Sequence, residues 1–364
     1  MTIASSGIGV GPTWQDAAEE AVVAALEGIA SANIGFLYIS DHFSTTAHEI
    51  HAFVRERTGI EILHGSVGIG ICSSRYEAMD EPAISLMLMN LPPKSYREVI
   101  LDNTTVAEEV PISSNWPVGI VHMDPRHPMA QAGPGVSFPE TFLLGGLTSS
   151  RFQNAQFSSL GVSERSASVL LLDSSVSIHS AVAQGCLPLG PKHIITECEG
   201  NILLSIDDRP ALEVFREELG DLARDNLQHV AANVFVGVGL PNRDTDDYVV
   251  RHLIGFNEDD QILAVAYPAK PGDTILFTRR DVQSAKTDMD RVLTTLKARL
   301  KETPRAGLYF SCVGRGSNLF DSPSYELEQI AETLGDFPLA GFFCSGEISH
   351  HELYGYTGVL VLFE

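Results

Sequence analysis

The sequence has 364 residues, of which 44% are hydrophobic, 20% charged and 8% aromatic. That composition can bury a sizeable core in one large domain or two smaller ones, and it excludes a disordered chain. Lysine and arginine number 24 against 47 acidic residues, a formal net charge of −23, and no basic run of five or more occurs. Nucleic acids and anionic membrane surfaces need clustered basic side chains, so we expect neither as a partner.

Amphipathic helices are predicted in four segments of the chain. A capping box at 13–16 precedes a row of alanines at helical spacing that ends near residue 28. Two longer segments, 209–230 and 281–300, carry apolar residues every three or four positions. The last helix, 323–334, begins with a proline and ends before Gly335.

Strands of two kinds are predicted between these helices. Four apolar runs have the length of a strand and lack alternation, which indicates strands covered on both faces. These runs are 34–39, 118–123, 168–172 and 307–310. The segments 177–206 and 248–278 alternate and are broken by glycine and proline, so we expect antiparallel hairpins there.

A loose repeat emerges when the strands are aligned with the segments that follow them. Each unit contains a strand, a crossover, a glycine-containing strand end and a return strand, and the units span 35–89, 117–172 and 306–363. Any α/β protein yields segments of this kind, so duplication is one of two interpretations. We predict an α/β fold in which repeated strand–helix–strand units form two sheets, with antiparallel hairpins in the middle. The domain boundary is placed between 1–231 and 232–364.

The cysteines bear on compartment and cofactors. Cys72, Cys186, Cys198, Cys312 and Cys344 are odd in number, widely spaced and never form a Cys-x-x-Cys pair. This argues against a disulfide framework and against a structural zinc site. No run of eighteen apolar residues occurs, and the first residues lack the features of a secretory signal. We therefore expect a cytoplasmic protein that needs neither metal nor cofactor.

Several motifs, in order along the chain, resemble those of the FIST family. GLYFSCVGRGSNLF, FPLAGFFCSGEI and LYGYTGVLVLF, all within 307–363, resemble its C-terminal half. QGCLPLGPKHIITECEGNILLSIDDRPALEVF (184–215) resembles its QGC turn, EGN hairpin and PALE helix. DDYVVRHLIGFNEDDQILAV (246–265) resembles its arginine-bearing strand pair. One departure is HGSVG (64–68), where the family usually has a G-C-S-x-x-G turn.

The resemblance implies a sensory protein with a FIST N-like domain at 1–231 and a FIST C-like domain at 232–364. It implies binding of a small metabolite, an amino acid in particular. No kinase, cyclase or methyl-accepting region follows the FIST-like segment, so we expect a separate signalling protein to carry the output.

Two charged residues fit a free amino acid, which needs a cation for its carboxylate and an anion for its ammonium group. Arg315 lies in a Gly-Arg-Gly turn after an apolar strand, and Glu347 follows another strand end. If the last unit is a right-handed crossover, both lie at the edge of the sheet where ligands gather. We expect them to hold the ligand. The alternative is a salt bridge between two turns.

Six further residues are candidate ligand contacts. They are Cys312, Gly346, Gln184, Asp41, Gly145 and Gly146. Glycines at strand ends let a ligand approach backbone N–H groups, although such glycines more often serve turns. The cysteine neighbours Arg315, and an inert buried thiol is the simpler interpretation of it. The glutamine lies in a turn, and the aspartate ends the equivalent strand of the first unit.

Two other classes of function stay open beside the sensory interpretation, which we favour. One is an interaction scaffold without a ligand. The other is an enzyme that uses Cys312 or Cys186 as nucleophile on a small metabolite. No Gly-x-Ser-x-Gly elbow is present, and His48 and His51 miss the zinc-binding H-E-x-x-H spacing by one residue. The glycine string at 7–11 lacks a preceding strand, so it is not a dinucleotide fingerprint.

Overall fold

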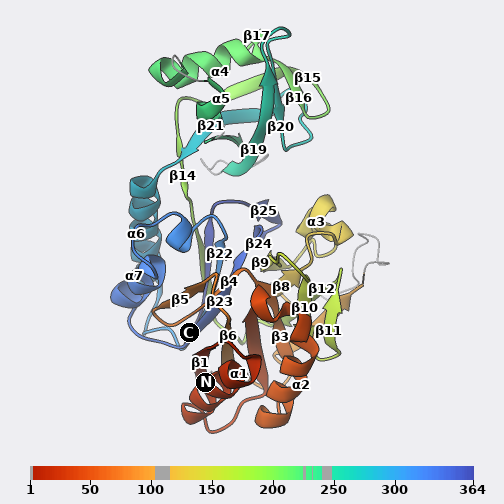
Figure 1. Ribbon diagram of the computed structural model, residues 1–364, viewed down its shortest axis with the longest axis vertical. Helices are drawn as coiled ribbons and strands as arrows, with labels where there is room; N and C mark the ends of the chain where they lie inside the picture. Colours follow the sequence, from red (N-terminus) through yellow and green to blue (C-terminus); the bar gives the residue numbers. More distant parts are fainter. Residues whose placement is uncertain (1–2, 103–114, 224–226, 232, 240–247) are drawn as a thin grey trace. The chain divides into compact units, whose positions relative to one another are not determined.

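The computed structural model describes residues 3–102, 115–223, 227–231, 233–239 and 248–364, and the chain forms two compact units (Figure 1). Unit 1 comprises Met1–Gln184 and Thr287–Glu364, and unit 2 comprises Gly185–Lys286. Unit 2 is therefore an insertion between two parts of unit 1. The domain boundary placed between residues 231 and 232 stays a prediction.

The described part of unit 1 contains three six-stranded sheets. The first has the spatial order β1 (Ile3–Val10), β6 (Ala83–Asn90), β2 (Ile34–Ser40), β3 (Leu63–Gly68), β10 (Ala155–Ser158) and β11 (Gly161–Glu164). The second has β25 (Glu352–Tyr354), β24 (Glu347–His350), β9 (Phe142–Leu147), β8 (Val118–Met123), β12 (Ala167–Leu172) and β7 (Tyr96–Leu101). The third has β13 (Ile178–Ala183), β26 (Gly358–Phe363), β22 (Ala306–Cys312), β23 (Leu339–Cys344), β4 (Gly70–Ser73) and β5 (Tyr76–Met79).

All three sheets follow one plan, which confirms the predicted α/β fold with repeated strand–helix–strand units. Each has a parallel central pair, β2–β3, β8–β9 or β22–β23. The return strand of each repeat, β6, β12 or β26, lies antiparallel to the first strand of its pair. A helix connects the two parallel strands: α2 (Ala47–Thr58), α3 (Pro128–Ala132) or α7 (Tyr325–Leu334). We call these units repeats 1, 2 and 3.

The repeats exchange hairpins in a cycle. The hairpin β4–β5 of repeat 1 extends the sheet of repeat 3 through β23. The hairpin β10–β11 of repeat 2 extends the sheet of repeat 1 through β3, and β24–β25 of repeat 3 extends the sheet of repeat 2 through β9. With the sheet of unit 2, the described residues therefore form four sheets where two were predicted. Each repeat builds a sheet of its own, and each sheet is completed by another repeat.

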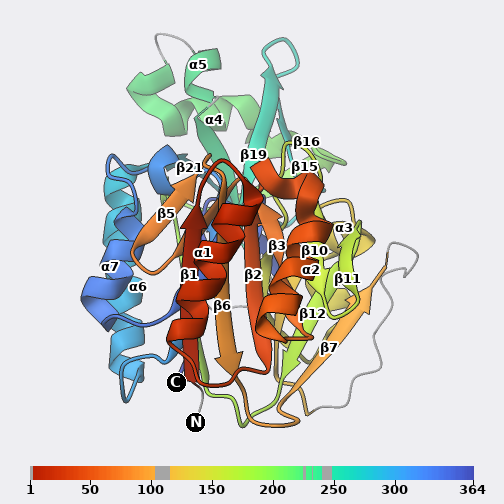
Figure 2. The same cartoon turned by 60° about the horizontal axis from the view of Figure 1, so that its bottom comes forward.

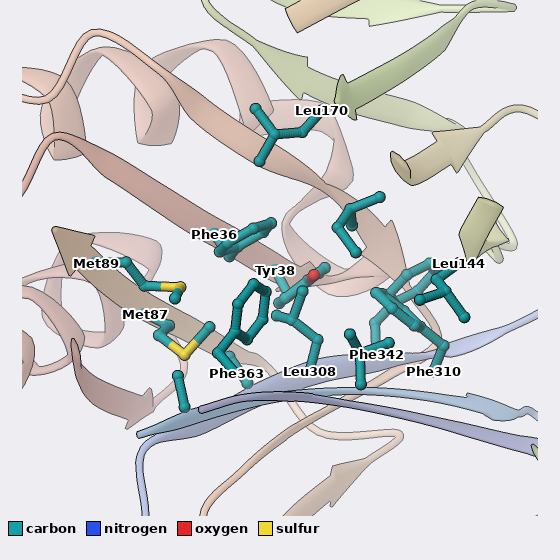
Figure 3. Close-up of a cluster of buried hydrophobic side chains, with 14 of the residues drawn as sticks. Phe36, Tyr38, Met87, Met89, Leu144, Leu170, Leu308, Phe310, Phe342 and Phe363 are labelled. Atoms are coloured by element: carbon teal, nitrogen blue, oxygen red, sulfur yellow. The ribbon is translucent and has the colours of Figure 1, made fainter. Parts of the chain in front are cut away.

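One apolar core is shared by the three sheets of unit 1 (Figure 3). Side chains alternate along each central strand, so Phe36 and Tyr38 face this core while Leu37 and Ile39 face the other side of the sheet. Residues at equivalent positions of the three repeats meet in the core. The ring of His122 lies 5.4 Å from that of Tyr38 and 5.7 Å from that of Phe310, centroid to centroid.

Helices pack on the outer faces of all three sheets, and on the second sheet the short helix α3 contributes Met129 and Ala130. The helices α1 (Trp14–Glu27) and α2 lie on the first sheet, as Figure 2 shows. The N-cap half of the predicted capping box is present, since the Thr13 hydroxyl accepts a hydrogen bond from the Asp16 N–H at 3.3 Å; the Asp16 carboxylate accepts from the same hydroxyl at 2.6 Å. A Cβ atom at Gly9 would lie 2.0 Å from a carbonyl oxygen of α1, so that glycine lets the helix lie directly on β1. The helices α6 (Val282–Arg299) and α7 pack on the third sheet.

Unit 2 contains the predicted hairpins. Its sheet has the order β14 (Cys186–Pro188), β21 (Thr274–Arg280), β15 (His193–Glu199), β16 (Ile202–Ile206), β20 (Ile262–Val265), β19 (Tyr248–Asn257) and β18 (Val234–Gly239), and β17 (Arg209–Pro210) pairs with β16. The predicted helix 209–230 is shorter than expected. It divides into α4 (Ala211–Leu219) and α5 (Leu227–Ala231), because Gly220 ends α4 with φ of 54°. Among the described residues, no helix is both long enough and apolar enough to cross a membrane.

Candidate functional site

The carboxyl ends of β22 and β23 gather six of the eight predicted site residues. The two strands end side by side in parallel register at Cys312 and Cys344. Arg315 follows in the turn after β22, and Glu347 begins β24; both are fully buried. The strand β24 pairs with β9, which sets Glu347 opposite Gly146. The residues brought together are Cys312, Arg315, Gly346, Glu347, Gly145 and Gly146.

Arg315 pairs with a carboxylate from α7 that sequence reasoning did not single out. Its Nε and Nη2 atoms donate to Oε1 of Glu326 at 2.9 and 2.6 Å, and Nη1 donates to the Tyr356 carbonyl at 3.2 Å. The same carboxylate accepts from the Tyr309 hydroxyl at 2.6 Å. The ring of Phe320 lies 5.6 Å from the guanidinium carbon. The charge of Arg315 is thus balanced by Glu326 inside the protein, without Glu347.

Glu347 has only half of its hydrogen-bonding capacity satisfied. Its Oε2 accepts from the N–H and the hydroxyl of Thr357, at 3.1 and 2.8 Å. Its Oε1 is buried and has no N–H or O–H donor among the described residues, although the thiol of Cys312, a weak donor, interacts with this carboxyl group. Burial raises the pKa of Glu347 to about 8, although Thr357, Arg315 and Cys312 act in the opposite direction. At neutral pH this side chain is therefore mainly a neutral carboxylic acid.

The thiols at the strand ends are poor nucleophiles in this environment. Burial, together with the nearby Glu347, raises the pKa of Cys312 to about 12. Burial also raises the pKa of Cys344 well above its usual range. Because the thiolate is the reactive form, these shifts weaken the interpretation of Cys312 as a catalytic nucleophile.

Close strand packing accounts for the glycines of the second parallel strands. Gly65, Gly145 and Gly341 occupy the same position in the three repeats. A Cβ atom at any of them would lie 1.8–1.9 Å from a carbonyl oxygen of the neighbouring strand, so only glycine fits. A Cβ atom at Gly146 would lie 2.2 Å from the Sγ atom of Cys344. Contact between strands is thus a sufficient reason for these glycines, and contact with a ligand stays a prediction.

The two other predicted site residues have partners elsewhere in unit 1. Asp41 accepts hydrogen bonds from Nη2 and Nε of Arg151 at 2.7 and 2.9 Å. Burial on its own raises the pKa of Asp41, but these bonds outweigh it and hold that pKa below its ordinary value. The backbone N–H of Gln184 donates to Asp288 at 2.6 Å.

Two buried carboxylates were missed by the sequence analysis. Glu326 lies on the apolar face of α7 with Ile330 and Leu334, which a helical period predicts, and an acid on such a face signals a buried partner. Glu77 lies in the β4–β5 hairpin, by which repeat 1 extends the third sheet, and it accepts a hydrogen bond from the N–H of Ser317 at 2.7 Å. Burial raises its pKa. Nothing local in the sequence marks Glu77, because its neighbours come from distant segments.

Histidines and acids do not combine into a metal centre in the part of the chain that the structure describes, where no group of three suitable side chains occurs. The buried His51 instead has its Nε2 atom 3.1 Å from the Ser158 carbonyl.

Comparison with known proteins shows which family models the sequence matches. The model of the FIST N domain matches residues 33–209, and the model of the FIST C domain matches residues 211–350. An uncharacterised protein of Mycobacterium tuberculosis is 26% identical over 388 aligned positions, which cover 98% of each chain. An uncharacterised protein of Mycobacterium bovis is 30% identical over 190 positions, covering 50% of this chain and 49% of that protein.

Proposed function

Because the chain belongs to the FIST family of sensory domains, we propose that it binds a small metabolite, an amino acid in particular, and signals through a separate protein. All five cysteines are free thiols, which supports a reducing cytoplasm as the place of action. The proposed site is the group of six residues at the ends of β22 and β23. Arg315 and Glu347 are its ionisable members.

The observation that carries the proposal is the unpartnered Oε1 of the fully buried Glu347. A buried polar atom without a partner costs free energy, and a ligand that supplies the missing donor recovers it. An ammonium group is the donor that matches a carboxylate best, because the bond is then charge-assisted. Binding would remove the proton from Glu347, whose pKa is about 8 in the unliganded protein.

Arg315 retains donors for the carboxylate of such a ligand. A guanidinium group has five N–H bonds, and three atoms of Arg315 make the hydrogen bonds given above. A ligand carboxylate would therefore join Glu326 on the guanidinium group rather than replace it. Cys312, Gly346 and the two glycines of β9 complete the proposed contacts.

Titration calorimetry with the free amino acids tests the proposal on the wild type, Arg315→Lys and Glu347→Gln. We expect each substitution to weaken binding by roughly ten- to a hundredfold, since each removes one charge-assisted contact. Glu49→Gln, which removes an exposed carboxylate from α2, is the control and should bind like the wild type. Wild-type affinity should also rise with pH, roughly tenfold per unit well below pH 8, because the ionised fraction of Glu347 rises in that way.

Three results would count against the proposal. Unchanged affinity in both variants, with a lower melting temperature, would leave Arg315 and Glu347 as structural residues only. No binding by any amino acid would favour the scaffold interpretation. Chemical turnover of a bound metabolite would favour an enzyme.

A further inference from the structure

A cavity lies in unit 1, and none of its lining residues belongs to the group at the strand ends that contains Glu347. Its volume is about 140 Å³, and its walls come from three segments. These are the 3₁₀-helix η1 (Asp41–Thr46), the first turn of α2, and residues 153–164, which include the hairpin β10–β11. The volume suits a molecule of a few non-hydrogen atoms rather than a nucleotide or a peptide.

Ser44 is one of the residues that line this cavity, and its hydroxyl group is unused. Ser44 is 1% exposed, and its Oγ has no hydrogen-bond partner among the described residues. The serine on the opposite wall is occupied, because Oγ of Ser163 lies 2.7 Å from Oγ of Ser166, which donates to Gln156 at 2.8 Å. Ser44 is therefore a wall group with hydrogen-bonding capacity left for an occupant.

Charge and apolar surface define the kind of occupant. Glu164 lines the cavity, and among the described residues its half-exposed carboxylate has one long ionic contact, with Arg126 at 3.4 Å. That carboxylate disfavours an anion and favours an ammonium group. Ala47, Ala155 and Val162 supply an apolar surface for a short carbon chain.

We propose that this cavity binds a small amino alcohol. Glu164 accepts from its ammonium group, Ser44 exchanges a hydrogen bond with its hydroxyl group, and the alanine and valine side chains contact its carbon atoms. The proposal is independent of the amino-acid site, since the two share no residue. A ligand of this size has an upper limit of affinity in roughly the tens of micromolar.

Ligand-observed NMR titration of the full chain with ethanolamine tests the proposal. We expect saturable binding that Glu164→Gln weakens at least about tenfold and Ser44→Ala weakens by a smaller factor. Ethylene glycol lacks the ammonium group and acetate carries the opposite charge, so both should bind at least about tenfold more weakly. Val162→Phe should also abolish binding, because the larger ring fills the cavity.

Two matched variants make the outcome decisive. Glu49→Gln removes a carboxylate of α2 that does not line the cavity, and Glu347→Gln alters the proposed amino-acid site. Both variants should bind ethanolamine like the wild type. Absence of saturation by ethanolamine, or equal binding by Glu164→Gln, would overturn the proposal. Loss of binding in Glu347→Gln alone would also overturn it, because the amine would then occupy the site at the ends of β22 and β23.

Discussion

Replacing Glu347 by glutamine measures what it costs to keep a carboxyl group buried at the strand ends. Its pKa is about 8 in the folded protein, against an ordinary value of 4.5. Between these pH values the folded chain holds a proton that the unfolded chain has released. The stability of the folded state therefore falls as pH rises, by about 1.4 kcal/mol per pH unit and by about 5 kcal/mol over the whole window.

Glutamine has nearly the same shape, still accepts hydrogen bonds from Thr357, and has no proton to lose. The stability of the variant relative to the wild type should therefore increase as pH rises from about 5 to 8, with little further change above about 8. For a body of the size of unit 1, the melting temperatures should diverge by about 2–3 °C per pH unit. Differential scanning calorimetry across this range, followed on the transition of unit 1, measures the divergence.

Glu49→Gln is the control for the loss of one negative charge, and its melting temperature should follow that of the wild type at every pH. If the difference in melting temperature between Glu347→Gln and the wild type stays constant with pH, the reasoning is refuted. A difference that shrinks as pH rises would mean that the folded state favours the ionised carboxylate.

Three further predictions concern the surroundings of this residue. Arg315→Ala leaves Glu326 buried without its cation and should destabilise unit 1 by about 3–5 kcal/mol in thermal unfolding; an unchanged transition would contradict the buried pair. Gly341→Ala places a Cβ atom 1.9 Å from a backbone oxygen and should cost about 3 kcal/mol or more, whereas Gly11→Ala, whose nearest neighbour is 3.9 Å away, should leave circular dichroism and melting unchanged. In the native protein, Cys312 and Cys344 should react with a thiol reagent at pH 8 far more slowly than after denaturation, and rapid native labelling of Cys312 would contradict its raised pKa.

The central strands could be predicted closely, whereas the pairing of the short strands could not. The run 118–123 coincides with β8, because burial on both faces leaves an unbroken apolar segment. The hairpin β4–β5 has strands of four residues each, and nothing in those residues specifies that they pair with β23 of another repeat. Partner choice at a sheet edge is decided by tertiary packing, which is why four sheets formed where two were predicted.

The placement of Arg315 and Glu347 at strand ends could be predicted from sequence, but the partner of the arginine could not. Glycine-flanked turns after apolar strands correctly indicated that Arg315 and Glu347 both lie at strand ends of repeat 3. The choice between Glu326 and Glu347 as partner of Arg315 depends on how the turn orients the guanidinium group. The helical period could have placed Glu326 on the buried face of α7, and that signal was available.

The threefold repeat supplies an internal comparison for Glu347. Each hairpin that one repeat contributes to the sheet of another has an equivalent residue at its first or second position. These residues are Ile71, Gln156 and Glu347, and each pairs with the same position of the strand that the hairpin extends. The first is an apolar core residue. The second has both ends of its amide occupied, since it donates to Thr148 at 2.7 Å and accepts from Ser166 at 2.8 Å.

Packing at this position is therefore satisfied by an aliphatic side chain and by a fully bonded amide. Neither burial nor strand pairing requires an acid there, and the acid present keeps one oxygen without a partner in the described part of the chain. A buried, half-bonded carboxyl group lowers stability, so a structural role alone gives no reason to have one. Selection for a ligand that completes its hydrogen bonds does give a reason. The substitution Glu347→Gln, which installs the residue that repeat 2 already uses, should thus produce a more stable protein at neutral pH with weaker amino-acid binding. A variant that is less stable and binds equally well would remove this argument for a site at Glu347.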